Sequence, residues 1–259
     1  MKIKMKTKDA SRVLTGILFL AGGSGLEAAI VAGNSLLIDF GVNTQTVSSP
    51  DSNGKYWNNA SNAVQTTVGG LTPASVNNLV TTTNTATGVN LSFSSGWNIN
   101  NPGGLNSPSS ALLGDLAVAN ATNDFYYIQG GVNSATITLS NLATDLVYNF
   151  ELFATREASD TRVTVYSITD VNGTHTFNLQ TSGAGAGTGA YTGNDDTLAT
   201  FSGIVPTVGG QITLTISRPN SFAYIDAAKI TAVVPEPSVF GLVGASALFG
   251  GLFLRRRHA

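Results

Sequence analysis

The feature that most limits the fold of this chain is a succession of short segments in which apolar and polar residues alternate. Gly, Asn and Ser separate these segments from one another. Alternation with a period of two is typical of strands that bury one face, and no amphipathic helical pattern intervenes. The predicted strands are residues 36–40, 64–68, 89–93, 125–129, 135–139, 147–154, 162–169, 174–179, 199–204, 211–217 and 224–233.

Many short strands without helices between them predict an all-β fold, a single antiparallel β-sandwich. A jelly roll is the first expectation and an immunoglobulin-like sandwich the second. Residues 98–110 are expected to be a long loop, with a short helix over residues 108–113 that stops at Gly114. The pair Asn172 and Gly173 favours a type I′ hairpin turn. Alternation predicts burial of Phe40, Val89, Leu91, Phe150, Leu152, Val163, Val165, Leu214, Ile216 and Ile225.

Near the C-terminus, an uncharged apolar run over residues 238–254 lies between a Pro-Glu-Pro element and three arginines. As a helix this run is about 25 Å long, near the lower limit for crossing a bilayer. Arginines beside a span mark its cytoplasmic side, so the residues before the run are expected outside. The prolines keep the glutamate between them extended and accessible. The flanking residues are Pro235, Glu236, Pro237, Arg255, Arg256 and Arg257.

These three parts, in this order, resemble the PEP-CTERM sorting signal. In that family a membrane enzyme, exosortase, recognises the signal, so the resemblance implies exosortase as a partner and a transient membrane anchor. It also implies export by a Gram-negative-type bacterium, often one that makes extracellular polysaccharide. An ordinary single-pass tail anchor is the alternative.

The N-terminus has the composition of a secretory signal peptide. Five basic residues come before an apolar stretch at 13–20 and small residues at 21–25. This pattern indicates a helix that signal peptidase removes near Ala28 or Ala29, and a retained signal anchor is the alternative. The expected division is a signal peptide at 1–29, a β-sandwich domain at 30–233, and a sorting signal with a transmembrane helix at 234–259.

Charge and cysteine content exclude some functions. Between residues 30 and 234, five Lys and Arg residues stand against twelve Asp and Glu, a formal charge of −7. Because an acidic domain repels phosphate backbones, nucleic acid is not expected as a partner. The chain has no cysteine, which excludes disulfides and thiol catalysis.

Parts of the central domain are similar to galactose-binding-like jelly rolls of secreted bacterial proteins. The similar segments are residues 38–41, 148–154, 162–166, 210–214 and 224–227. That family includes carbohydrate-binding modules and purely structural domains, so the resemblance implies a fold more than an activity.

Sugar recognition requires an exposed aromatic face and planar polar groups that bind hydroxyls. The aromatic candidates are Trp57, Trp97 and Tyr126, and the polar candidate is Arg156. Aromatic residues in a sandwich more often belong to its core, and that alternative stays open for each ring.

A second candidate site is the loop with Asn194, Asp195 and Asp196, whose oxygen atoms suit a structural Ca²⁺. A solvated turn is the alternative, because the spacing is not that of a known calcium loop. No other cofactor is expected. His175 has no Gly-x-Ser-x-Gly motif to accompany it, so a hydrolytic triad is not expected either.

The sequence therefore predicts an exported, non-enzymatic protein of the cell surface or extracellular matrix. We expect it to be anchored in the membrane first and then released or attached. A carbohydrate-binding module for exopolysaccharide is the first alternative. A glycan-active hydrolase with an unrecognised carboxylate pair is the second.

Overall fold

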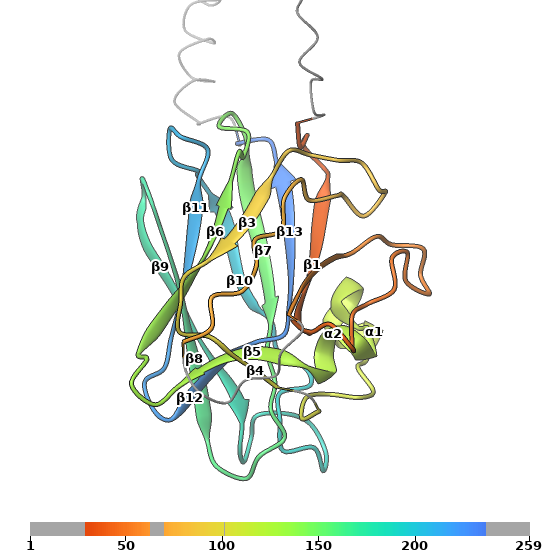
Figure 1. Ribbon diagram of the computed structural model, residues 1–259, viewed down its shortest axis with the longest axis vertical. Helices are drawn as coiled ribbons and strands as arrows, with labels where there is room; N and C mark the ends of the chain where they lie inside the picture. Colours follow the sequence, from red (N-terminus) through yellow and green to blue (C-terminus); the bar gives the residue numbers. More distant parts are fainter. Residues whose placement is uncertain (1–28, 63–69, 101, 237–259) are drawn as a thin grey trace, which may run out of the picture.

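Strands dominate the computed structural model, which describes residues 29–62, 70–100 and 102–236. The prediction of an all-β fold with antiparallel sheets is confirmed. Figure 1 shows two large sheets, a small sheet across the lower end, and two short helices on one flank. The predicted strand at 64–68 and the two terminal address segments lie outside the described residues.

The first sheet has the strand order β10-β7-β13-β1-β2. Its strands are β1 (Ser35–Val42), β2 (Asn58–Asn62), β7 (Val147–Phe153), β10 (Ala199–Ile204) and β13 (Ala227–Val233). Neighbours are antiparallel except β1 and β2, which run parallel, so the expectation of a wholly antiparallel sandwich is wrong here. The Asn58 amide donates to the carbonyls of Leu37 (3.0 Å) and Val80 (2.9 Å), which fastens this Asn-rich strand beside β1.

The second sheet has the order β3-β6-β11-β8-β9, and the small sheet has the order β12-β5-β4. The second sheet consists of β3 (Asn90–Phe93), β6 (Ser134–Ser140), β8 (Arg162–Asp170), β9 (Gly173–Ser182) and β11 (Ile212–Ser217). The small sheet consists of β4 (Asn98–Asn100), β5 (Phe125–Gln129) and β12 (Phe222–Ile225).

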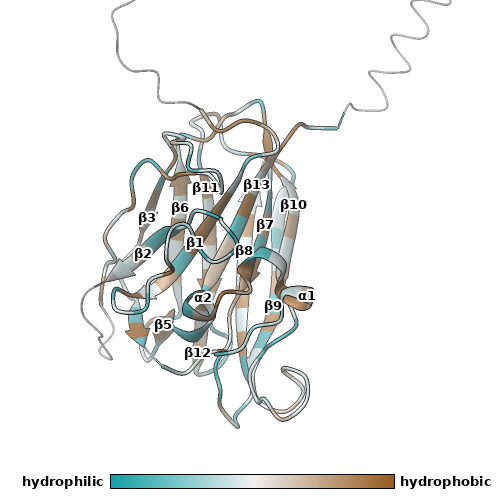
Figure 2. Ribbon diagram, turned by 90° about the vertical axis from the view of Figure 1, so that its right-hand side faces the viewer, coloured by the Kyte–Doolittle hydropathy of each residue, from teal (hydrophilic) through white to brown (hydrophobic). Residues whose placement is uncertain are grey.

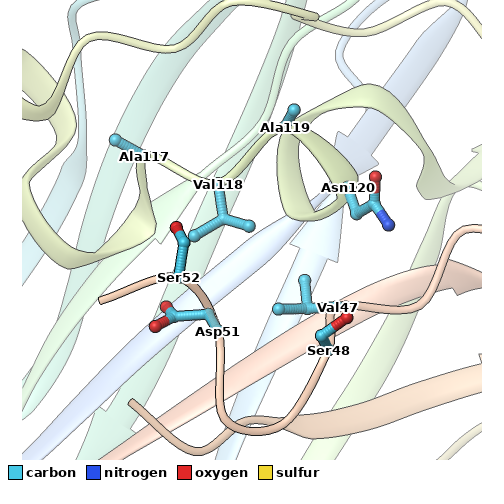
Figure 3. Close-up of a pocket in the computed structure, with 8 residues that line it drawn as sticks. All are labelled: Val47, Ser48, Asp51, Ser52, Ala117, Val118, Ala119 and Asn120. Carbon is cyan, nitrogen blue, oxygen red and sulfur yellow. The ribbon is translucent and has the colours of Figure 1, made fainter. Parts of the chain in front are cut away.

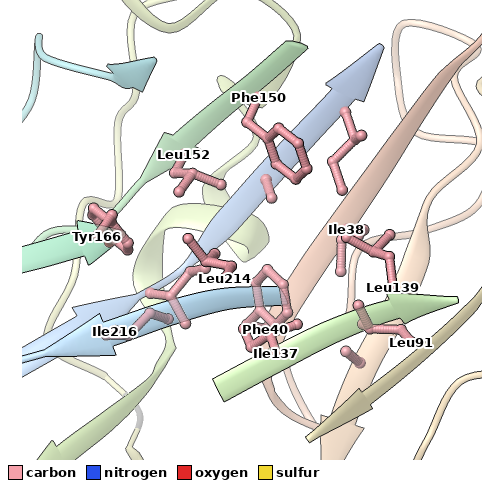
Figure 4. Packing of buried hydrophobic residues seen from close by; sticks show 14 of the residues in the cluster. Ile38, Phe40, Leu91, Ile137, Leu139, Phe150, Leu152, Tyr166, Leu214 and Ile216 are labelled. Carbon is pink, nitrogen blue, oxygen red and sulfur yellow. The ribbon is translucent and has the colours of Figure 1, made fainter. Parts of the chain in front are cut away.

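The main core lies between the first and second sheets (Figure 4). Alternate residues of each strand point into it, as the period of two demands. Burial is confirmed for eight of the ten predicted core residues, namely Phe40, Val89, Leu91, Phe150, Leu152, Leu214, Ile216 and Ile225.

Strand β8 turns the opposite face to the core from the one predicted. Val163 and Val165 are only partly buried, whereas Thr164, Tyr166 and Ile168 are buried. The Tyr166 hydroxyl donates to the carbonyl of Tyr224 at 2.6 Å, and the Thr164 hydroxyl accepts from the Tyr224 N–H at 2.8 Å. The backbone of β12 thus satisfies both inner hydroxyls, which lets polar side chains occupy core positions.

Two further local expectations are wrong. Asp170 pairs with Gly173, so the β8–β9 turn has Val171 and Asn172 at its centre, and neither has the positive φ of a type I′ turn. Instead, the Asp170 carboxylate accepts from the Asn172 N–H at 2.7 Å. The predicted strand over 224–233 is broken at Asp226 into β12 and β13.

The helical segment covers the other face of the first sheet, and Figure 2 shows its helices on this flank. The predicted short helix is α1 (Ser110–Leu113), and η1 (Gly114–Leu116) and α2 (Ala119–Asn123) follow it. Within the stretch expected to be a loop, strand β4 forms as well. A second, smaller core results, which includes Leu37, Val47, Trp57, Leu113, Leu116, Ala121 and Phe153.

Candidate functional site

Trp57 lies inside the second core and does not offer a ring to solvent. The residue is 3% exposed, and its indole N–H donates to Asp51 Oδ2 at 2.9 Å. Asp51 in turn lines a pocket of about 290 Å³, here called the flank pocket (Figure 3). The flank pocket is lined by Val47, Ser48, Asp51, Ser52, Ala117, Val118, Ala119 and Asn120.

Trp97 and Tyr126 belong to the main core. Both are fully buried, with ring centroids 6.0 Å apart, and Phe93 packs edge-on against each ring. The expectation of exposed binding rings is therefore wrong for Trp57, Trp97 and Tyr126. Neighbouring Asn residues made these positions look like loops, but strands β2 and β4 begin directly after the two tryptophans.

Arg156 is the predicted glycan residue that the structure places beside a pocket. This pocket, called the rim pocket, has a volume of about 290 Å³. It lies beyond the end of β7, where the chain leaves the first sheet. Its lining residues are Pro102, Gly103, Gly104, Asn106, Arg156 and Glu157.

Several contacts fix the guanidinium of Arg156. It lies 5.5 Å from the ring centroid of Phe125, and Nη1 donates to the Pro102 carbonyl at 3.3 Å. The Glu157 N–H donates to the Gly103 carbonyl at 2.9 Å, which ties the two walls of the pocket together. At Gly103, where φ is +157°, a Cβ would lie 1.2 Å from Arg156 Nη1, so any side chain there would displace the guanidinium.

Arg156 differs from the other described arginines in its partners. Arg162 forms a bidentate ion pair with Asp160, and Arg218 donates hydrogen bonds to several backbone carbonyls. In the described part of the chain, no carboxylate forms an ion pair with Arg156. Exposed Glu157 and Asn106 line the same pocket and supply acceptors.

The loop predicted as a calcium site is organised differently. Asn194 is buried; its amide nitrogen donates to the carbonyls of Ala154 and Thr197, and its oxygen accepts from the Thr197 N–H at 2.9 Å. The Asp195 carboxylate binds Thr188, and the Asp196 carboxylate accepts from the Thr197 hydroxyl. Hydrogen bonds that shape the loop engage all three side chains, so the arrangement favours a structural turn.

Of the predicted sorting signal, Pro235 and Glu236 are described, and both are exposed directly after β13 ends at Val233. Pro237 and the arginines at 255–257 lie outside the described residues. Between residues 29 and 236, with the gaps at 63–69 and 101, no helix is long and apolar enough to cross a bilayer.

Three buried aspartates form a feature that sequence reasoning missed. Asp39, Asp124 and Asp226 are at most 2% exposed, and each accepts one backbone N–H through Oδ2. The Oδ1 atom of each is buried without a hydrogen-bond partner. The sequence does contain a sign of Asp39, because this charged residue interrupts the apolar run of the predicted strand at residues 36–40.

The electrostatics of the three carboxyls reflect this burial. Burial raises the pKa of Asp39 well above its ordinary value, and the charge of Asp124 raises it further. Burial raises the pKa of Asp124 to about 7. Burial also raises the pKa of Asp226 well above its usual range, although the Thr155 N–H opposes this shift. The folded chain therefore favours the neutral form of these groups unless a positive charge compensates them.

No protein-family model matches the chain, and a search of curated proteins finds no match. Function must therefore be inferred from the residues and their geometry.

Burial of Asp226 predicts a specific pH dependence of stability. A carboxyl with a raised folded-state pKa binds more protons folded than unfolded, so the unfolding free energy falls as pH rises above about 4. In chelator-containing buffer, urea unfolding at about pH 5 and about pH 8 should show a smaller fall for Asp226→Asn than for the natural protein.

The matched control is Asp145→Asn, which changes an exposed carboxylate and should leave the fall unchanged. Parallel stability curves for the natural protein and Asp226→Asn would show that the buried carboxyl does not contribute.

Proposed function

We propose that this chain is an exported, non-enzymatic protein of the cell surface or extracellular matrix, sorted by exosortase in a Gram-negative-type bacterium. The observation that carries the proposal is the order of Pro235-Glu236-Pro237, the apolar run and the terminal arginines. This order begins directly after the last strand of the described domain. Signal peptidase is the other partner in export.

The position of the chain ends supports this proposal. The N–H of Gly33 donates to the carbonyl of Ala232 at 2.8 Å, and the N–H of Ala232 donates to the carbonyl of Asn34 at 3.0 Å. The described chain thus starts and ends side by side, at the upper end in Figure 1. Pro235 and Glu236 are exposed there, as a protease substrate requires.

For the finer fold, we propose a galactose-binding-like jelly roll. The chain crosses repeatedly between the two large sheets: β6 is in the second, β7 in the first, β8 and β9 in the second, β10 in the first and β11 in the second. Such alternation between facing sheets is what a jelly roll requires.

The outer face of the second sheet supports a role among neutral, hydrated polymers. Its outward positions carry hydroxyl groups that pair across strands: Thr138 with Thr213 at 3.1 Å, and Thr169 with Thr174 at 2.9 Å. None of the outward residues on the five described strands of this sheet is charged. A face of this kind can lie against polysaccharide without repelling it electrostatically.

Processing tests the main proposal. The intact mass of the protein recovered outside the cell should be well below the 26.7 kDa of the whole chain. Loss is expected at both ends, near Ala29 and between Val234 and Pro237. The same gene expressed without exosortase is the control and should keep the C-terminal arginines. An exported mature form that still carries Arg255, Arg256 and Arg257 would contradict the sorting proposal.

A carbohydrate-binding role is the second candidate, and the rim pocket favours it. Arg156 offers donors and Glu157 offers acceptors on one wall, an arrangement that can bind two neighbouring hydroxyls of a sugar. Val147 pairs with Val233 while Phe153 pairs with Ala227, so β7 leads from the chain-end side to the rim pocket. A ligand there would approach the end of the domain remote from the sorting segment.

Glycan-array retention tests this second candidate. Arg156→Gln and Glu157→Gln should each reduce binding at least about tenfold, because each removes charge-assisted hydrogen bonds to hydroxyls. Asp145→Asn, which removes a carboxylate at the other end of β7, is the control and should bind normally. Equal retention by all three variants would exclude the rim pocket as the binding site.

A further inference from the structure

Three oxygen-bearing side chains lie on one face of the β1–β2 pair. Asp39 and Gly41 are two residues apart, so they face the same side of the first sheet as Leu37 of the second core. On the neighbouring parallel strand, Asn59 pairs in register with Asp39, and its side chain projects from that same face.

The third side chain comes from the end of the helical segment. Gly41 leaves room for the Asp124 carboxylate, since a Cβ at residue 41 would lie 1.9 Å from Oδ2 and 2.6 Å from Oδ1. The Val42 N–H holds this carboxylate through Oδ2 at 2.6 Å. Asp124 is thereby placed on the same face of β1 as Asp39.

Around these three side chains there are more hydrogen-bond acceptors than donors. Asp39 Oδ2 accepts from the Val47 N–H at 3.0 Å, and the Asn59 amide nitrogen donates to the Val47 carbonyl at 3.0 Å. The remaining oxygens, Oδ1 of Asp39, Asn59 and Asp124, are buried without a partner. No described lysine or arginine forms an ion pair with either carboxylate. Each such orphan acceptor destabilises the folded chain, and a buried unpaired charge destabilises it more.

Tyr126, in the neighbouring main core, is a further buried polar group without a partner. The residue is fully buried, and its hydroxyl has no hydrogen-bond partner. Its ring packs 6.1 Å from that of Phe40. Burial raises the pKa of Tyr126, and the charges of Asp39 and Asp124 raise it further.

We propose that Asp39, Asn59 and Asp124 form a Ca²⁺ site that locks the helical segment onto β1. Two carboxylates balance the charge of one divalent cation, and all the ligand atoms are oxygens, as Ca²⁺ prefers. Ca²⁺ tolerates irregular ligand sets that include amide and backbone carbonyls, whereas Mg²⁺ demands near-octahedral geometry. The site is distinct from the loop at residues 194–196.

The flank pocket lies next to this site. Val47 lines the pocket (Figure 3), and its peptide N–H and carbonyl bind Asp39 and Asn59 respectively. Ser48 and Asn120 add polar groups to the lining, which suits a partly hydrated ion.

Calorimetric titration with Ca²⁺ alone, on the full-length chain freed of metal by a chelator, tests the proposal. One ion per chain should bind, and the melting temperature should rise with Ca²⁺ concentration. Asp39→Asn and Asp124→Asn should each weaken binding at least about tenfold, by analogy with losses at metal-site partners. Because either variant can also destabilise the fold, binding is compared at a temperature where circular dichroism shows each variant folded.

The matched controls are Asp145→Asn, an exposed carboxylate outside the site, and the pair Asp195→Asn with Asp196→Asn. Both controls should bind Ca²⁺ normally. The proposal is overturned if the natural chain shows neither heat nor a thermal shift up to about 10 mM Ca²⁺, the weak limit for extracellular calcium sites. It is also overturned if the change at 195 and 196, rather than at 39 and 124, abolishes binding.

Discussion

The packing of the Asp124 carboxylate against Gly41 is the contact that attaches the helical segment to the first sheet. Through it the end of α2 and the start of β5 are joined to β1 of the first sheet. This contact also brings an electrostatic cost, because the carboxyl groups of Asp39 and Asp124 are both buried and one oxygen of each has no hydrogen-bond donor. Burial of two like charges is tolerable only if protons or a cation neutralise them.

The proposed sorting segment and the proposed glycan site lie at opposite ends of the domain. The described chain starts and stops at one end, where Pro235 and Glu236 are exposed. The rim pocket with Arg156 and Glu157 lies beyond the other end of β7. An anchored precursor would thus present the rim pocket away from its anchor. Without disulfides, the sandwich must hold through core packing and its buried polar contacts.

The sequence was sufficient to predict most strands and most of the core, because alternation reports directly which face is buried. It failed where polar residues are buried with partners supplied from a distance. Thr164 and Tyr166 in β8 are core residues because the backbone of β12, about sixty residues away, binds their hydroxyls. Local alternation contains no information about such partners.

The site residues were harder to predict for the same reason. Asn-rich surroundings suggested that Trp57 and Trp97 lie in loops, yet β2 and β4 follow them and their rings fill the two cores. Arg156 was identified as a candidate, but its position over Phe125 depends on Gly103, which is distant in sequence. Asp39 and Asn59 are neighbours because β1 and β2 pair, and Asp124 reaches the same face because the helical segment folds back onto β1. No sequence motif indicates either contact.

Crystallography with Mn²⁺ in place of Ca²⁺ tests the claim about this buried oxygen cluster most directly. Mn²⁺ accepts carboxylate and carbonyl oxygens and scatters anomalously, so its position can be read without reference to stability. We predict one strong anomalous peak between the side chains of Asp39, Asn59 and Asp124, with oxygen distances of about 2.0–2.6 Å. No peak there, or a peak at Asp195 and Asp196 instead, would contradict the account.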